Sequence, residues 1–81
     1  MNYAYLVRCA DGTLYAGWTT DLARRVQAHN DGRGAKYTRS RRPVTLVYYE
    51  TFRTGTEARR REAAFKRLTR AEKLALIETA R

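Results

Sequence analysis

Residues 3–18 read Tyr-Ala-Tyr-Leu-Val-Arg-Cys-Ala-Asp-Gly-Thr-Leu-Tyr-Ala-Gly-Trp, and this stretch decides the fold. Its two halves, 3–9 and 13–18, are rich in the β-branched and aromatic side chains that favour strands. The tripeptide between them contains Asp-Gly, a dipeptide that favours tight antiparallel turns. We therefore predict a β-hairpin at the start of the chain.

The turn of this hairpin has two interpretations, which differ by one residue of register. A two-residue Asp-Gly loop of type I′ would place Tyr15 opposite Arg8, on the other face of the sheet from Tyr5. A three-residue Ala-Asp-Gly loop, with its glycine left-handed in a bulge, would pair Tyr15 with Val7 and place both tyrosines on one face. The pairing pattern alone leaves both interpretations open.

A helix is predicted directly after the hairpin. Residues 19–21 offer side-chain oxygens that can cap a helix N-terminus. Leu22, Val26 and His29 then recur at helical spacing, and the Asn-Asp-Gly run at 30–32 ends the pattern.

The remainder of the chain predicts one more strand and two more helices. Residues 31–43 form a polar, basic loop, and 44–51 read as a strand with enough consecutive apolar residues to be central in the sheet. Helices are expected to begin near 55–57 and near 70, because each position follows a threonine with capping-box spacing to a glutamate. The order is then ββαβαα. The expected fold class is α/β of the α+β type, a small, mainly antiparallel sheet with helices packed against it.

Length and composition limit what the chain can be. Its 81 residues allow one small domain, so residues 1–81 are expected to form a single unit. One cysteine and one histidine exclude an internal disulfide and a four-ligand zinc site. No apolar run reaches the roughly 20 residues that span a bilayer, and the N-terminus lacks the pattern of a secretion signal. A cytoplasmic location without membrane contact is the resulting expectation.

The charge of the chain points to a polyanionic partner. Lys and Arg number 17 against 8 Asp and Glu, a formal net charge of +9, and each cation that neutralises a phosphate releases counterions and strengthens binding. Nucleic acid is favoured over a membrane surface because the basic residues of 31–43 lie in a glycine-containing loop rather than on one face of an apolar helix. The residues expected to contact nucleic acid are Arg24, Arg33, Lys36, Tyr37, Arg39, Arg41, Arg42 and Lys66, with Tyr37 able to stack on an unpaired base.

Two charged residues interrupt the apolar faces of the predicted helices. Arg25 lies within the apolar stripe of the first helix, and Glu62 lies in the middle of a stripe formed by Ala58, Phe65 and Leu68. Such side chains are seldom buried without a partner. One interpretation is structural: a buried Arg25–Glu62 ion pair, or side chains that reach past the core edge to water.

The other interpretation is chemical. An arginine can stabilise charge that grows on a phosphate, a carboxylate can hold a divalent cation, and a phenol near that cation loses its proton more readily than its free pKa of ~10 suggests. Arg25, Glu62 and the tyrosines of the hairpin together would make a phosphodiesterase. His29 lies one helical turn after Arg25 and could orient a water or the Tyr15 hydroxyl.

These residues, in this order and spacing, resemble the GIY-YIG nuclease family. The matching positions are Tyr5, the tripeptide Tyr15-Ala16-Gly17, Arg25, His29 and the later helical Glu62. Residues 9–25 in particular resemble the small, single-domain bacterial branch of the family, and the likeness extends over nearly the whole chain.

The resemblance implies a fold, a reaction and a role for each residue. The fold is a three-stranded antiparallel sheet flanked by helices, and the reaction is divalent-metal-dependent hydrolysis of a DNA phosphodiester. Tyr15 would activate water, directly or through a metal-bound hydroxide, and Arg25 would steady the transition-state phosphate. Glu62 would hold Mg²⁺ or Mn²⁺ through a water-rich shell, while Tyr5 and His29 would position the water and the Tyr15 phenol. Because both tyrosines face the active site in the family, the resemblance also favours the three-residue turn.

Three hypotheses about function follow. The first is an endonuclease that selects DNA by structure rather than sequence, such as branched or damaged DNA in repair or recombination, with a partner protein able to supply further specificity. The second is a non-cleaving nucleic-acid-binding module on the same fold, because the first motif reads Tyr3-Ala4-Tyr5 and no asparagine follows Glu62. The third, suggested by size and charge alone, is a basic ribosome-associated protein.

Overall fold

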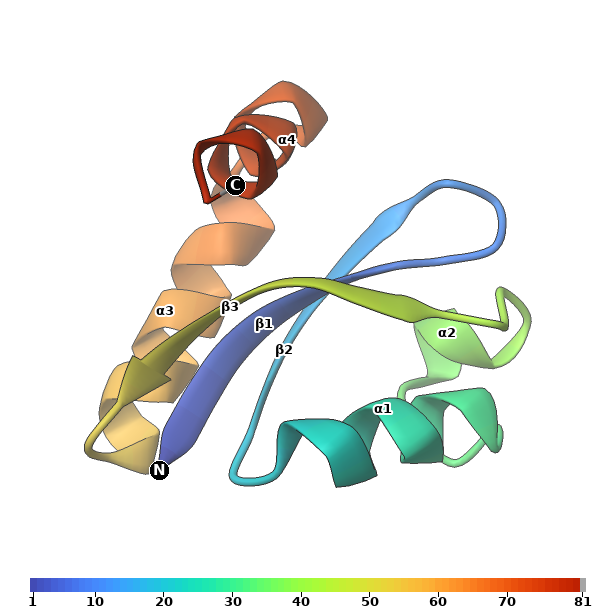
Figure 1. The fold of residues 1–81 in the computed structure, drawn as a ribbon, viewed down its shortest axis with the longest axis horizontal. Helices are drawn as coiled ribbons and strands as arrows, with labels where there is room; N and C mark the ends of the chain where they lie inside the picture. The colour runs from blue at the N-terminus through green and yellow to red at the C-terminus, as the bar shows by residue number, and fades with distance from the viewer. Residues whose placement is uncertain (81) are drawn as a thin grey trace.

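The computed structural model describes residues 1–80, which form three strands and four helices (Figure 1). The strands are β1 (Asn2–Arg8), β2 (Leu14–Thr19) and β3 (Thr45–Phe52), each within one residue of its predicted range. The helices are α1 (Leu22–Asn30), α2 (Lys36–Arg39), α3 (Gly55–Arg67) and α4 (Arg70–Thr79). The α+β class and the antiparallel sheet are confirmed. Within residues 1–80, no helix is both long enough and apolar enough to cross a bilayer.

The sheet order is β2-β1-β3, so β1 is the central strand. The prediction that the strand at 44–51 is central was wrong, since β3 lies at an edge. Four consecutive residues of β1, Ala4–Val7, are buried completely. The apolar run in β3 has another cause: the pairing of β1 with β3 shifts by one residue between Leu6 and Val7, and this bulge leaves Val47 opposite no residue of β1. Val47 then packs against the same core as its neighbour Tyr48.

The turn of the hairpin is the three-residue loop. A backbone hydrogen bond of 2.9 Å from Gly12 N–H to the Cys9 carbonyl closes it, and Gly12 is left-handed with a φ of +84°. Tyr15 consequently pairs with Val7. This register places Tyr15 on the same face of the sheet as Tyr5, as the family resemblance implies.

Helices cover both faces of the sheet (Figure 1). The side chains of β1 alternate between two cores. Even-numbered residues of β1 meet Phe65 and Ile77 of α3 and α4, whereas odd-numbered residues meet Leu22 and Val26 of α1. The candidate site residues of β1 and β2 have odd numbers, so they lie on the face that α1 covers.

The three longer helices begin where the sequence predicts. Asp21, Thr54 and Thr69 are the N-caps of α1, α3 and α4, and each side chain accepts a hydrogen bond from the backbone N–H three residues later. At α4 the capping box is complete, because the Glu72 carboxylate also accepts from the Thr69 N–H at 2.8 Å.

The segment 31–43 is not the irregular loop that the sequence predicts. It contains the short helix α2, which makes the element order ββααβαα. Four residues are too few to show a helical period, so the sequence carries no signal for this helix. No side chain caps its N-terminus at Ala35. Instead Thr38 is completely buried and hydrogen-bonds to His29 of α1, so a contact with another element holds α2 in place.

Candidate active site

Tyr5 of β1 lies at the centre of the candidate site. Its side chain is completely buried, and its hydroxyl lies 2.8 Å from Nε2 of His29 and accepts a hydrogen bond of 3.3 Å from Nε of Arg25. Burial raises the pKa of the Tyr5 phenol; the hydrogen bond and charge of Arg25 oppose this rise, and the charges of Tyr15 and Glu62 add to it. The side chains predicted to be catalytic therefore lie within electrostatic reach of one neutral phenol.

His29 joins β1 to the basic loop. It is completely buried, with Nε2 at Tyr5 and Nδ1 at 2.7 Å from Oγ1 of Thr38. Burial, and secondly the charge of Arg25, lower the pKa of His29 to about 4, so the imidazole is neutral at pH 7. Both ring nitrogens are bonded to protein, which leaves neither to orient a water or the Tyr15 hydroxyl. His29 meets Tyr15 instead in an edge-to-face contact, with ring centroids 5.6 Å apart at 71°.

The neutral His29 is expected to make stability depend on pH. Its folded pKa of about 4 lies below its ordinary value of 6.5, so the folded state binds fewer protons than the unfolded state between these two values. The contribution of the neutral His29 to the free energy of unfolding is complete above pH 6.5 and is lost as the pH falls below that value. The free energy of unfolding should therefore fall by about 2 kcal/mol between pH 7 and pH 5. Urea unfolding at the two pH values measures the loss. His29→Gln should lack it, and an equal loss in both proteins would contradict a neutral buried imidazole.

Tyr15 of β2 is held by its ring rather than by its hydroxyl. The ring stacks on that of Tyr37, with centroids 5.6 Å apart and 20° between the planes. Nζ of Lys66 lies 5.8 Å from the Tyr15 ring centroid. Tyr15 is only partly buried, and within residues 1–80 no hydrogen bond holds its hydroxyl. The phenol is ordered, and its oxygen remains available to a water or a substrate.

Glu62 of α3 is the candidate metal ligand. Its side chain is 22% exposed and lies 3.6 Å from Nζ of Lys66, one helical turn later. It forms no ion pair with Arg25 in the described residues, so the predicted alternative of a buried Arg25–Glu62 pair is not found there. Within residues 1–80, no three side chains of Asp, Glu, His or Cys come together as a metal-binding group. One accessible carboxylate still fits Mg²⁺ or Mn²⁺, because Mg²⁺ keeps several waters and takes one or two carboxylates from a protein.

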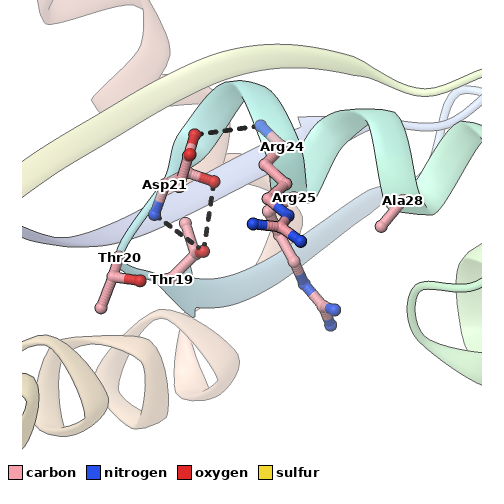
Figure 2. A pocket seen from close by; sticks show the side chains of 6 residues that line it. All are labelled: Thr19, Thr20, Asp21, Arg24, Arg25 and Ala28. Carbon is pink, nitrogen blue, oxygen red and sulfur yellow. Dashed lines mark hydrogen bonds between the residues drawn. The ribbon is translucent and has the colours of Figure 1, made fainter.

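A cavity of about 530 Å³ opens beside Arg25, at the start of α1 (Figure 2). Arg25 uses Nε on the Tyr5 hydroxyl, so the two terminal nitrogens of its guanidinium remain for a ligand. Arg24 also lines the cavity, together with Thr19, Thr20 and Asp21; the Thr19 hydroxyl and one Asp21 carboxylate oxygen are hydrogen-bonded within the turn that caps α1. Figure 2 shows both arginine side chains leaving α1 toward the same side. Two neighbouring guanidinium groups suit a phosphate group.

Gly17 gives a physical reason for the glycine of the second motif. It pairs with Tyr5 across β1 and β2, and a Cβ at this position would lie 2.3 Å from the Tyr5 hydroxyl oxygen and 2.5 Å from Cζ. Only a residue without a side chain lets the Tyr5 ring lie across β2 and reach Arg25 and His29.

The basic residues predicted to bind nucleic acid fall into two groups. Some are held by intramolecular contacts: Arg33 by Asp31, Arg41 by Asp11 and the Tyr37 carbonyl, Arg42 by the Arg39 carbonyl, and Lys66 by Glu62. The others are exposed and have no side-chain partner within residues 1–80: Arg24, Lys36 and Arg39. Only the second group is free to meet phosphates without breaking a contact of the fold.

Tyr37 has a different environment from the one expected of a base-stacking residue. Its ring stacks on Tyr15 and carries the Arg41 guanidinium 4.0 Å from its centroid. Although 39% of the residue is exposed, these two contacts occupy its π surface. Tyr37 therefore supports the ring of Tyr15.

Sequence reasoning missed Thr38 and Gly34. Thr38 supplies the second hydrogen-bond partner of His29. Gly34 packs against the same ring, because a Cβ there would lie 2.3 Å from Nδ1 and 2.8 Å from Cα of His29. The available signal was His29 itself, since a histidine in an apolar stripe needs partners for both ring nitrogens. The identity of those partners depends on how the following loop folds back.

Comparison with known proteins gives consistent matches. Residues 1–75 match the family model described as the GIY-YIG catalytic domain. A UPF0213 protein of Clostridium perfringens is 54% identical over 79 residues, which cover 98% of this chain and 85% of that protein. A UPF0213 protein of Halobacterium salinarum is 55% identical over 77 residues, which cover 95% of this chain and 100% of that protein.

Two solution NMR structures resemble the fold over nearly its whole length. The UPF0213 protein of Bacillus halodurans has a TM-score of 0.61 and 45% identity, with 98% of this chain and 85% of that chain covered. A protein from E. faecalis has a TM-score of 0.63 and 49% identity, with 96% of this chain and 83% of that chain covered.

Proposed function

The chain belongs to the GIY-YIG family, and on that premise we propose that it is a divalent-metal-dependent endonuclease that hydrolyses DNA phosphodiester bonds. The observation that carries the proposal is the group around the Tyr5 hydroxyl. Arg25 and His29 hydrogen-bond to that hydroxyl, and the charges of Tyr15 and Glu62 act on it. A guanidinium, a phenol and an accessible carboxylate thus all act on one buried hydroxyl.

Tyr15 is the proton acceptor in the proposed reaction. Its hydroxyl has no partner within residues 1–80, while its ring is fixed by His29 and Tyr37. Tyr15 acts in its phenolate form: it takes one proton from a water as the water oxygen attacks the phosphorus, one bridging P–O bond breaks as the new P–O bond forms, and the departing oxygen takes a proton from solvent. General-base catalysis of this kind contributes about 10²- to 10⁴-fold to the rate.

Arg25 stabilises the charge that the attack places on the phosphate. Tyr5 holds Nε of Arg25, so the planar guanidinium presents its other N–H groups toward the cavity of about 530 Å³. A preorganised donor is worth more to the transition state than a mobile one, because it needs no reorganisation when charge develops.

Glu62 would hold the divalent ion, Mg²⁺ or Mn²⁺. Such an ion, when bound, supplies Lewis-acid stabilisation of the phosphate oxygens. Lys66 lies 3.6 Å from the same carboxylate, so it balances the charge of Glu62 in the absence of the ion.

DNA recognition in this proposal depends on shape. The exposed cations Arg24, Lys36 and Arg39 meet backbone phosphates, and such contacts position DNA without reading its bases. Residues 1–81 act as one nuclease domain on branched or damaged DNA, as arises in repair or recombination, and a partner protein can add specificity. The support is the exposed charge of these three residues, of which Arg24 lines the cavity, and the family membership.

Removal of the metal tests the proposal. Supercoiled, branched and single-stranded DNA are incubated with the protein in Mg²⁺ or Mn²⁺ and then with EDTA. We expect nicking that EDTA abolishes and added Mg²⁺ restores. Glu62→Gln should behave in Mg²⁺ as the wild type does in EDTA, whereas Glu78→Gln removes the same charge from the exposed end of α4 and should nick normally. Undiminished nicking in EDTA would contradict the metal requirement.

A non-cleaving binding module is the second candidate. It is favoured by the lone carboxylate at the metal position, with no asparagine after Glu62 and no three-residue metal group within residues 1–80. The same experiment separates the two, because a binding module would shift all three DNAs in a gel and nick none of them in Mg²⁺ or Mn²⁺.

A further inference from the structure

Thr38 lies outside the motif residues, yet it continues a chain of hydrogen bonds that begins at Arg25. Nε of Arg25 donates to the Tyr5 hydroxyl at 3.3 Å, and that hydroxyl lies 2.8 Å from Nε2 of His29. Nδ1 of His29 lies 2.7 Å from Oγ1 of Thr38, which donates to the Ala35 carbonyl at 3.0 Å. Tyr5, His29 and Thr38 have no exposed surface, so bulk water does not take part.

The hydrogen bonds of this series all point in one direction. A backbone carbonyl can only accept a hydrogen bond, so the single hydroxyl proton of Thr38 is donated to the carbonyl oxygen of Ala35. Its Oγ1 then accepts a hydrogen bond from Nδ1–H of His29. A neutral imidazole carries one N–H, so Nε2 is the bare nitrogen and accepts the proton of the Tyr5 hydroxyl. The Tyr5 oxygen keeps its lone pairs for the N–H of Arg25.

We propose that Thr38 is a positioning residue, which holds His29 as the Nδ1–H tautomer and thereby fixes the Tyr5 hydroxyl as the acceptor that orients Arg25. Its effect on cleavage rests on the proposed nuclease function. Its effect on the tautomer rests only on the four hydrogen bonds.

Loss of the Thr38 hydroxyl would reverse the direction of the hydrogen bond between His29 and Tyr5. The Nδ1–H tautomer would have a buried donor without an acceptor, which is costly. The other tautomer would place a proton on Nε2, so His29 and Arg25 would both donate to the Tyr5 oxygen. The Tyr5 proton would have to turn away from His29, toward the side on which Arg25 lies. Arg25 would then lose a fixed partner next to the cavity.

The packing around His29 leaves Thr38 no substitute. Gly34 lies so close that a Cβ would come within 2.3 Å of Nδ1, and the backbone there covers the edge of the ring. Thr38 is the buried polar residue of α2, and the other three residues of this helix are exposed. A hydrogen bond to the buried ring of His29 explains why Thr38 is buried and why the residue carries a hydroxyl group.

The test uses the full chain, in which His29 is the sole histidine and its ring signals need no assignment. Ring ¹⁵N shifts at pH 7 report the tautomer of the wild type, of Thr38→Val and of Thr38→Ser. Steady-state nicking of supercoiled DNA in Mg²⁺ gives kcat and KM for the same three proteins. Thr38→Val keeps the shape of the side chain without its hydroxyl, and Thr38→Ser keeps the hydroxyl.

We expect the wild type to carry its proton on Nδ1. Thr38→Val should move it toward Nε2 and lower kcat by up to about 100-fold, the loss that a small misplacement in an active site causes, with KM unchanged. Thr38→Ser should restore both readouts. A wild type protonated on Nε2, or a folded Thr38→Val with the wild-type tautomer and kcat, would overturn the proposal.

The two proposals fail separately. A wild type that nicks no DNA defeats the nuclease function, while the ring shifts still decide the role of Thr38 toward His29. If Thr38→Val does not fold, the wild-type tautomer and the Thr38→Ser protein decide it alone, since either one protonated on Nε2 would overturn the proposal.

Discussion

Replacement of Tyr15 by phenylalanine is expected to lower the rate of DNA nicking by about 10²- to 10⁴-fold, the range that general-base catalysis contributes. The change removes one oxygen atom from a side chain whose ring contacts all remain, with Tyr37 and His29 each 5.6 Å away between centroids. Because no hydrogen bond within residues 1–80 holds the Tyr15 hydroxyl, the free energy of unfolding and the affinity for DNA should stay close to those of the wild type.

A matched control exists on the opposite edge of the sheet. Tyr49 of β3 is 52% exposed and meets Tyr3 through its ring, at a centroid distance of 6.0 Å. Tyr49 pairs with Tyr5 across β1 and β3, but β1 separates it from Tyr15, so Tyr49→Phe removes the same atom from an exposed side chain on another strand and should nick at the wild-type rate. Plasmid nicking in Mg²⁺, with DNA affinity from fluorescence anisotropy and stability from urea unfolding, measures all three properties. A Tyr15→Phe protein that nicks as fast as the wild type would show that another group accepts the proton.

Replacement of Gly17 by alanine is expected to disable the site without touching any charged residue. The new methyl group would lie 2.3 Å from the hydroxyl oxygen of Tyr5, so the Tyr5 ring has to move and its contacts with Arg25 and His29 have to break. Overpacking of a core costs about 1–3 kcal/mol of stability. We also expect a loss of at least about 100-fold in nicking, because Arg25 loses the group that orients it.

Gly12→Ala is the control for this substitution. Gly12 has a φ of +84° and nothing within 4 Å of its Cβ position. Alanine there should cost about 1–2 kcal/mol through backbone strain, with nicking unchanged at a temperature where the protein stays folded. The two variants therefore have similar losses of stability and different activities. If Gly17→Ala cleaves at the wild-type rate, the close approach of Tyr5 to β2 has no part in catalysis.

The elements of the fold could be read from local signals. The hairpin follows from β-forming residues on either side of Asp-Gly, and the N-caps at Asp21, Thr54 and Thr69 mark three helices at their observed starts. Such signals act over a few residues, so they survive without knowledge of the rest of the chain. The position of β3 in the sheet could not be predicted from such local signals. Its apolar run reflects a bulge at Val47, and a bulge exists only in relation to a partner strand.

The sequence proposes members for the candidate site but does not predict the contacts that these residues make. Arg25 and Glu62 stand out in the sequence because each interrupts an apolar stripe, yet they do not pair with each other in the described residues. Tyr37 and Arg41 were expected to face DNA, and the structure directs them to Tyr15 and Asp11. An exposed cation in the sequence can meet either a phosphate or a carboxylate of its own chain, and only the fold decides between them.

The sequence by itself determined the strands, the three longer helices, the family and the residues that carry its motifs, since spacing along the chain is a local property. The tertiary structure alone decided which basic side chains remain free and that Thr38 completes the hydrogen bonds of His29, and it established the hairpin register that the pairing pattern had left open. The physical reason is burial. A polar group removed from water must find a partner, and the nearest partner in space lies on a segment whose path the local sequence does not encode.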